Sequence, residues 1–342
     1  MIPSNAVMMG LTAAVLGAGC QCVDPDLQRA QGQFIADAAH NRVAPDVGAG
    51  GRPASDGGGT TGVVIAAAGD IACATCAQGA TADLLDGLLR TRGLAALLPL
   101  GDDAYASGSP QEFESFYRPA WGRPELLAIT HPVPGNHEYA DGLATGYFDF
   151  FDGAGNTTGV AGTRGLGYYS FDLAGWHLIA LNTSDGCTPV SCAAGSPQYQ
   201  WLVADLAAHP ARCTLAFWHH PRFQAGATSG EEVAAAPLWN ALFDAGADVV
   251  LNGHEHGYQQ LAPLDKSGAI DRARGMRTFV VGTGGGEFDA GFAGPRVSAL
   301  ETTLVDIHGV LELTLRPGGY DWRFVAVGGD TAAAASGTDA CH

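Results

Sequence analysis

The chain has 342 residues, of which 46% are hydrophobic and 15% charged, a balance that indicates a globular fold and argues against a disordered chain. Its 17 Lys and Arg residues against 35 Asp and Glu residues give a net charge of −18, which argues against nucleic acid or an anionic membrane as a partner. Lys266 is the only lysine, and this bias toward Arg, with the excess of Ala and Gly, is typical of a GC-rich bacterial genome. Nothing in the composition predicts the oligomeric state.

The N-terminal segment, residues 1–22, is apolar and rich in small residues, which predicts an export signal. Its apolar run from Ala6 to Gly19 is too short to cross a membrane and leads into Cys20 in a partial lipoprotein-like pattern, so Cys20 is a candidate lipid anchor. Residues 23–61 lack hydrophobic periodicity and predict a flexible linker. We therefore expect an exported protein, periplasmic, extracellular or lipid-tethered, without an integral membrane span.

From residue 62 onward, short apolar runs alternate with amphipathic segments, a pattern typical of a layered α/β fold. The apolar runs predict largely buried strands over Val63–Ala68, Leu94–Leu100, Leu126–Ile129, Trp176–Leu181, Thr214–Trp218, Val249–Leu251 and Thr278–Val281. Helical spacing predicts helices over Gln78–Arg92, Pro197–Ala208 and Glu231–Ala245. Alternation over 301–327 predicts more strands, including a hairpin of 303–307 with 311–315. We expect one folded domain over 62–328 and a C-terminal tail over 329–342.

Eight cysteines are numerous for a cytosolic enzyme of this size and fit an oxidising compartment. Beyond Cys20 and Cys22, the other six can be grouped into three pairs, although the sequence alone does not fix their connectivity: Cys73 with Cys76, Cys187 with Cys192, and Cys213 with Cys341. The C-x-x-C spacing of the first pair also allows a zinc site. No second C-x-x-C follows it, so a disulfide is the favoured interpretation.

Five apolar runs end in clusters of Asp, Asn or His, and four of these clusters begin with glycine. The clusters are Gly69-Asp70, Gly101-Asp102, Gly135-Asn136-His137-Glu138, His219-His220-Pro221 and Gly253-His254-Glu255-His256. The carboxyl ends of strands form one rim in open α/β sheets, and ligands bind there. Any one cluster has an ordinary interpretation as a turn or a cap. Five of them together predict a single site assembled from strand ends.

These clusters, extended to G-D-x-A at Gly69–Ala72 and G-D-x-x-Y at Gly101–Tyr105, resemble the motif set of the calcineurin-like metallophosphatases. The resemblance covers about residues 62–290. It implies an α/β fold of four layers, a β-sandwich flanked by helices, and a two-metal phosphoesterase. The first motif of that superfamily is usually D-x-H, but Ala72 takes the place of its histidine here. Tyr105 in the second motif is the arrangement of the purple acid phosphatases.

By this resemblance, seven side chains bind two metal ions that share Asp102. Metal one is implied to bind Asp70, Asp102, Tyr105 and His256, and metal two Asp102, Asn136, His219 and His254. A phenolate with carboxylates suits Fe(III), whereas imidazole, amide and a shared carboxylate suit Zn²⁺, Mn²⁺ or Fe²⁺. The resemblance therefore implies Fe(III) paired with one of these divalent ions.

The implied reaction is hydrolysis of a small phosphate monoester, in which hydroxide generated on the metals attacks phosphorus in line. His137 is the implied catalytic residue beside Asp102 and contacts the phosphate or protonates the leaving oxygen. Glu138 is expected to orient His137 or to serve as a cap, and His220 and Arg222 are candidate substrate contacts. Two alternatives remain open: a phosphodiesterase or nucleotidase on the same centre, and a catalytically silent exported binding domain.

Overall fold

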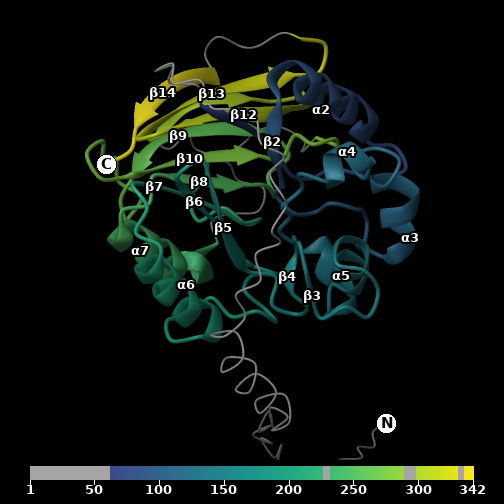
Figure 1. Cartoon of the computed structure of the whole chain (residues 1–342), viewed down its shortest axis with the longest axis horizontal. Helices are drawn as coiled ribbons and strands as arrows, with labels where there is room; N and C mark the ends of the chain where they lie inside the picture. The colour runs from purple at the N-terminus through teal and green to yellow at the C-terminus, as the bar shows by residue number, and fades with distance from the viewer. Residues whose placement is uncertain (1–61, 226–231, 289–297, 330–334) are drawn as a thin grey trace, which may run out of the picture. The chain divides into compact units, whose positions relative to one another are not determined.

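Two β-sheets form the centre of the chain in this computed structural model, which describes residues 62–225, 232–288, 298–329 and 335–342 (Figure 1). The five-stranded sheet has the order β14 (Ser336–Ala340), β13 (Gly319–Ala326), β12 (Gly309–Arg316), β1 (Val63–Ala68) and β2 (Leu94–Pro99). The seven-stranded sheet has the order β11 (Leu300–Leu304), β9 (Tyr258–Leu264), β10 (Met276–Val281), β8 (Val249–Asn252), β7 (Cys213–Phe217), β6 (Trp176–Ala180) and β5 (Tyr169–Leu173). The expected export signal and linker lie outside the described residues.

The helices lie around the two sheets. They are α2 (Gln78–Arg92), α3 (Pro110–Glu112), the π-helix η1 (Phe113–Tyr117), α4 (Pro124–Leu127), the 3-10 helix η2 (His137–Asp141), α5 (Thr145–Phe151), α6 (Pro197–Ala208), the 3-10 helix η3 (Val233–Ala235) and α7 (Ala236–Ala245); β3 (Thr158–Gly159) and β4 (Gly162–Thr163) form a small separate sheet. In Figure 1, α2 lies against the five-stranded sheet, whereas α6 and α7 lie beside the seven-stranded one. This order of layers confirms the expected four-layer α/β fold.

Local sequence explains where the longer helices begin and end. The Ser196 hydroxyl accepts a hydrogen bond from the Tyr199 backbone N–H, and Pro197 occupies the first turn, so α6 begins there. Gly93 adopts a left-handed conformation with φ of 68° directly after α2 and ends it. The predictions of helices over Gln78–Arg92 and Pro197–Ala208 are therefore confirmed, with the same bounds. The third begins as η3 and continues as α7, while Glu231 lies outside the described residues.

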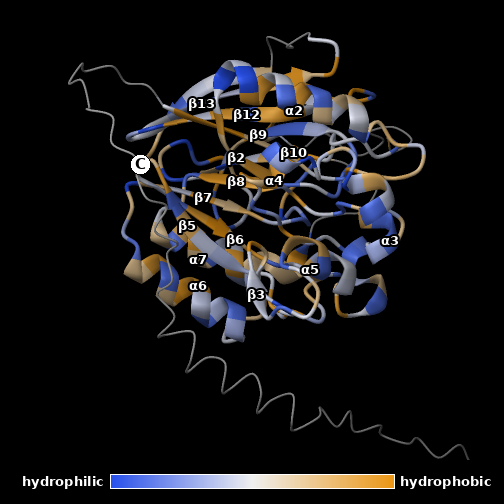
Figure 2. Ribbon diagram, turned by 45° about the vertical axis from the view of Figure 1, so that its right-hand side comes forward, coloured by the Kyte–Doolittle hydropathy of each residue, from blue (hydrophilic) through white to orange (hydrophobic). Residues whose placement is uncertain are grey.

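Four central strands of the seven-stranded sheet, β6, β7, β8 and β10, are buried along their whole length, which is why they appear in the sequence as continuous apolar runs. On β7, Leu215 and Phe217 pack into the core between the two sheets. The alternate residues Ala216 and Trp218 pack with Trp239 in a second core under the helices. Figure 2 shows hydrophobic residues concentrated in these central strands. The period of two along each strand therefore builds two cores at once.

The predicted strand over Leu126–Ile129 is wrong, because its first two residues belong to α4. Pro124 occupies the first turn of that helix, a position that suits the fixed φ of proline. The chain then runs beside β2, where Leu97 donates its N–H to the Ile129 carbonyl at 2.8 Å and accepts one from His131 at 2.8 Å. This extended segment still brings the next polar cluster to the carboxyl end of β2.

The predicted hairpin of residues 303–307 with 311–315 is also wrong, although strands do form in this part of the chain. The first strand, β11, pairs with β9 in the seven-stranded sheet. The second, β12, pairs with β13 and β1 in the five-stranded sheet. Between them Asp306 adopts a left-handed φ of 54°, and the chain passes from one sheet to the other. Residues 336–340, in the segment expected as a tail, form β14 beside β13.

All three expected cysteine pairs are disulfides: Cys73–Cys76, Cys187–Cys192 and Cys213–Cys341. The first excludes the alternative zinc site, because both of its sulfur atoms are bonded to each other. The third joins the start of β7 to the chain end beyond β14, and so links the two sheets. Among the helices described, none combines the length and the apolar character needed to cross a bilayer.

Candidate metal centre

The polar clusters meet because β1 and β2 are parallel, β7 and β8 are parallel, and both pairs end at the same edge of the two sheets. The Gly69 N–H donates to the Val281 carbonyl at 2.8 Å, which joins the ends of β1 and β10 across the sheets. The His254 backbone N–H donates to Asp70 Oδ2 at 2.8 Å. Side chains that are far apart in the sequence therefore converge at this edge, as expected.

One set of donor atoms surrounds the Tyr105 hydroxyl. Its oxygen lies 3.0 Å from Asp70 Oδ1, 3.3 Å from Asp102 Oδ2 and 3.0 Å from His256 Nε2. His256 Nε2 is in turn 3.2 Å from Asp70 Oδ1. These four side chains are the ones that the resemblance implies for metal one.

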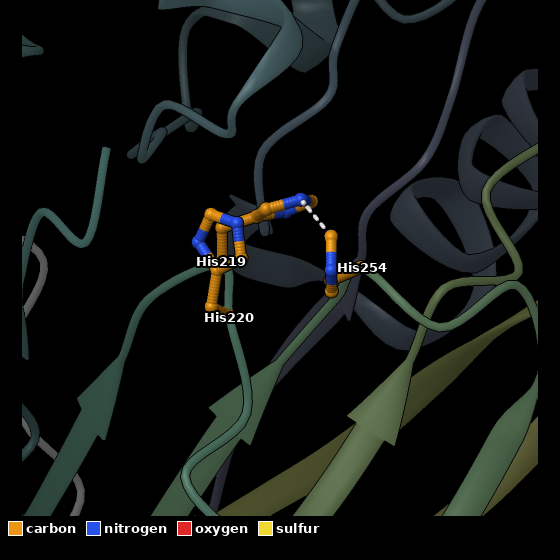
Figure 3. Close-up of side chains that lie close together, drawn as sticks. All are labelled: His219, His220 and His254. Atoms are coloured by element: carbon orange, nitrogen blue, oxygen red, sulfur yellow. Dashed lines mark hydrogen bonds between the residues drawn. The ribbon is translucent and has the colours of Figure 1, made fainter. Parts of the chain in front are cut away.

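A second set surrounds His219 Nε2, which lies 3.2 Å from Asn136 Oδ1, 3.2 Å from His254 Nδ1 and 3.4 Å from Asp102 Oδ2. The other ring nitrogen, Nδ1, donates to the Leu100 carbonyl at 2.8 Å and so directs Nε2 into the cluster. Figure 3 shows the contact between the His219 and His254 rings, with His220 beside them. These are the side chains implied for metal two, and Asp102 Oδ2 belongs to both sets.

Each set contains more lone pairs than protons. The Tyr105 hydroxyl has a single proton for three acceptor atoms, and His219 Nε2 has at most one for three neighbours. A cation would bind the lone pairs of all the ligand atoms in a set at once. Carboxylate, phenol, amide and imidazole groups are also ligands that iron, zinc and manganese accept in proteins. The residues therefore fit two cations that share Asp102, and one atom each from Asp70, Asp102 and His219 lies within 4.8 Å of the others.

The pKa values reflect this crowding. Burial raises the pKa of Asp102, but the charges of His219 and His137 lower it more, so that it lies well below its usual range. Burial lowers the pKa of His219, but Asp102 raises it to about 9. Burial and the His219 charge lower the pKa of His254 to about 4. Burial and two carboxylates raise the pKa of Tyr105 well above its ordinary value, so a phenolate there requires a strong positive charge beside it.

Three of the expected ligands adopt left-handed backbone conformations, with φ of 61° at Asp70, 52° at Asp102 and 73° at His254. Such a conformation costs a non-glycine residue about 1–3 kcal/mol and persists only where the surroundings impose it. Glycine 135 provides part of these surroundings. A Cβ atom at Gly135 would lie 2.2 Å from Asp102 Oδ1, so only glycine fits beside this carboxylate.

Glu138 holds the same loops together from inside. Its carboxylate is buried and accepts backbone N–H groups from Asp102 and Asp103, both at 2.9 Å, and from Gly135 at 2.8 Å. Burial and the Asp102 charge raise its pKa to about 7. Of the two expectations for Glu138, the structure therefore has the cap: the carboxylate binds backbone amides of the loops that carry the ligands.

The remaining candidates differ in exposure. His137 has a side chain 36% exposed, with Nδ1 2.7 Å from the Ala106 carbonyl and Nε2 3.7 Å from Asp102 Oδ2. His220 is only 6% exposed, and its Nδ1 lies 3.0 Å from the Thr183 hydroxyl. The Arg222 guanidinium lies over the Phe223 ring, 4.2 Å from its centre. His137 is therefore at the centre and accessible, His220 is at the centre but buried, and Arg222 packs on an aromatic ring.

Two residues near the ligands were not among the expectations: Thr183, which contacts His220, and Glu287, which contacts His256. Thr183 follows the apolar run over β6 in the same way as the five clusters, so that signal could have found it. The backbone carbonyl of Glu287 accepts a hydrogen bond from His256 Nδ1 and fixes the direction of that ring. No sequence pattern marks this contact, because any residue has a carbonyl.

Comparisons with known proteins agree with this geometry. The family model described as calcineurin-like phosphoesterase matches residues 63–258. Purple acid phosphatase 22 of Arabidopsis thaliana is 33% identical over 186 residues, which are 48% of this chain and 38% of that protein. Purple acid phosphatase 21 of the same plant is 31% identical over 189 residues, 52% of this chain and 41% of that protein. The chain thus spans less than half the length of these relatives.

Solved structures show the same fold. The purple acid phosphatase PPD1 from yellow lupin (Lupinus luteus) has a TM-score of 0.64 at 18% identity, covering 82% of this chain and 54% of that one. GAP50 of Plasmodium, described as an anchor in the inner membrane complex, has a TM-score of 0.61 at 16% identity and covers 82% and 88% of the two chains. The resemblance to purple acid phosphatases is confirmed by these relatives, and the family model matches more than half of this chain. The chain therefore belongs to the calcineurin-like phosphoesterase family.

Proposed function

We propose that this chain is a dinuclear metal-dependent phosphoesterase that hydrolyses phosphate monoesters. The observation that carries the proposal is the shared oxygen, Asp102 Oδ2, which belongs to the donor sets of both Tyr105 and His219. The donor types support Fe(III) on the side of Tyr105 and Zn²⁺, Mn²⁺ or Fe²⁺ on the side of His219. Similarity to purple acid phosphatases over about half the chain supports the same assignment.

Two cations bound there would polarise the phosphoryl group and acidify a water molecule for in-line attack. The chain's own residues supply the rest. The His137 backbone N–H donates to Asp102 Oδ1 at 2.9 Å and so fixes the orientation of this carboxylate. His137 donates Nδ1–H to the Ala106 carbonyl, and its Nε2 faces the centre from an exposed position. From there it can bind a phosphoryl oxygen or protonate the leaving oxygen.

Substrate contacts are proposed for His137 and Arg222, whose guanidinium suits a phosphate oxygen. The buried His220 contacts Thr183 and lies 4.3 Å from the His254 ring, so we assign it support of His254 rather than the expected substrate contact. The proposed substrate is a small phosphorylated molecule. Three disulfides support an oxidising, exported location for the enzyme.

Metal analysis and paired substrates test the proposal. The purified full chain should bind two metal ions and hydrolyse p-nitrophenyl phosphate faster than its bis ester. Turnover of the bis ester alone would instead assign a phosphodiesterase to the same centre. Absence of bound metal would favour a silent binding domain, an outcome that the fold itself allows, since the structural neighbour GAP50 is described as an anchor.

A further inference from the structure

The loop that follows Asp70 is closed by the Cys73–Cys76 disulfide and contacts the segment that carries Tyr105. The Ala72 N–H donates to the Asp103 carbonyl at 3.2 Å, and the Tyr105 N–H donates to the Ala72 carbonyl at 2.8 Å. Ala72 and Ala104 thus form a short parallel bridge. The backbone of the disulfide loop therefore fixes where the Tyr105 segment begins.

The same loop contacts the segment that orients His256. The Thr75 hydroxyl donates to Glu287 Oε1 at 3.2 Å, and the backbone carbonyl of Glu287 accepts from His256 Nδ1. The Ala77 N–H donates to the Gly285 carbonyl at 2.8 Å. The loop of eight residues 70–77 therefore carries Asp70, one of the expected ligands of metal one. It also contacts the segments that position two more of these ligands, Tyr105 and His256.

The disulfide is placed within the loop so that it constrains these contacts. Thr75 lies between the two cysteines, and the Gln78 side chain donates to the Cys73 carbonyl at 2.8 Å. Both cysteines are partly exposed, whereas the cysteines of the other two disulfides in the described residues are at most 9% exposed. The Cys73–Cys76 bond is therefore the most accessible of the three to a reductant.

We propose that the Cys73–Cys76 disulfide positions the donors of metal one, so that its reduction by a dithiol selectively weakens the binding of that cation. The reductant transfers two electrons and two protons, the sulfur–sulfur bond breaks into two thiols, and the dithiol becomes a disulfide. Thr75 then loses its fixed distance to Glu287, and the His256 ring loses its orientation. The inference rests on the proposed metal centre.

The contrast with Cys213–Cys341 gives the test its control. A cross-link stabilises a protein more when it closes a longer loop, and these sequence separations are 3 and 128 residues. Cys213 begins β7, at the end of the strand remote from His219. Loss of the Cys213–Cys341 bond should therefore lower the stability of the fold without disturbing the metal centre. Loss of the Cys73–Cys76 bond should disturb the metal centre and leave the stability almost unchanged.

The experiment compares Cys73→Ser/Cys76→Ser with Cys213→Ser/Cys341→Ser, each in the full chain loaded with Fe(III) and Zn²⁺ and dialysed against a chelator. The first variant should lose affinity for one cation by about 10–100-fold, with an almost unchanged Tm, while the second cation stays bound. The control should have a lower Tm and unchanged metal retention. The proposal would be overturned if the first variant retained both cations as well as the wild type does. It would also be overturned if the control lost a cation to the same extent as the first variant.

A Thr75→Val variant keeps the disulfide and removes only the contact with Glu287. It should release the same cation as the double variant, to a smaller extent, and unchanged retention would overturn the route through Glu287. The wild-type chain separates this inference from the proposed function. If the wild type binds no cations, the proposed function fails; if it binds two and the variants do as well, only the role of the disulfide fails.

Discussion

The two ends of the seven-stranded sheet both carry clusters of histidine and aspartate, yet their charges are arranged differently. Away from the centre, His177 Nδ1 lies 2.8 Å from Asp172 Oδ1, and its Nε2 lies 2.8 Å from Asp205 Oδ2. One protonated imidazole between two carboxylates uses every proton it has. The Ser170 hydroxyl donates to Asp205 Oδ1 at 2.8 Å, and His209 Nδ1 lies 3.2 Å from the same oxygen. This cluster is complete by itself.

At the other end, no such internal balance exists. His219 Nε2 has at most one proton to share among its three polar neighbours. The Tyr105 hydroxyl likewise has one proton for its three polar neighbours. Both clusters could be proposed as metal sites from their composition and spacing alone. The number of histidines and carboxylates is therefore a weak criterion for a metal site, and an excess of lone pairs over protons is a stronger one.

The largest test of this contrast is a pair of aspartate substitutions. Asp102→Ala removes the oxygen common to both donor sets, so activity should fall by more than about a thousandfold, with loss of bound metal. The measurements are kcat on p-nitrophenyl phosphate and metal content. Asp172→Ala, in the cluster around His177, is the matched control and should change neither. Equal effects of the two substitutions would remove the distinction between the clusters.

A second test concerns the support of the centre. Glu138→Gln puts an NH₂ group where a carboxylate accepts several backbone N–H groups, so the ligand loops should shift and metal affinity should fall by about 10–100-fold. Titration of apo protein with Zn²⁺ measures the change. Glu114→Gln, which removes an exposed ion pair with Arg118, should leave the affinity as it is.

A third test addresses the proposed Fe(III) site. A tyrosinate bound to iron absorbs visible light, so the wild type should show a band that Tyr105→Phe abolishes while metal two remains bound. The check is an absorption spectrum together with iron quantification. A colourless wild type with full activity would leave a two-metal phosphoesterase and refute the ferric assignment.

The smallest expected effect is on stability at the cluster around His177. Burial lowers the pKa of His177, but Asp205 and Asp172 raise it more, so its folded-state pKa lies above its unfolded value near 6.5. Its contribution is therefore complete below about pH 6 and is lost as the pH rises through the folded pKa. His177→Gln should cost about 2 kcal/mol of unfolding free energy at pH 5 and less at pH 9. Urea unfolding at the two pH values measures this, and an equal loss at both would contradict it.

The sequence predicted most strands and helices because each forms a continuous run with its own period. It failed where the partner, and not the run, decides the structure. Leu126–Ile129 is too short for its apolar residues to distinguish helix from strand. The runs on either side of His308 alternate correctly, but nothing local specifies that they join different sheets.

The candidate site was predictable to the extent that its groups are side chains at strand ends. Asp70, Asp102 and His254 each follow a glycine or begin a turn that the sequence makes visible. The supports are backbone groups: the Leu100 carbonyl for His219 and the Glu287 carbonyl for His256. Such contacts depend on how loops pack, so a single sequence carries no sign of them.

The disulfide between Cys213 and Cys341 has a consequence for how metal would leave the protein. It joins the two sheets covalently at one end, whereas at the other end Asp102 follows a strand of one sheet and His219 a strand of the other. Cations bound between Asp102 and His219 would form a second link between the two sheets, and this link would be reversible. Their release would then be limited by local separation of the sheet edges, and amide hydrogen exchange near these two ligands should quicken in chelator while the residues around Cys213 stay protected.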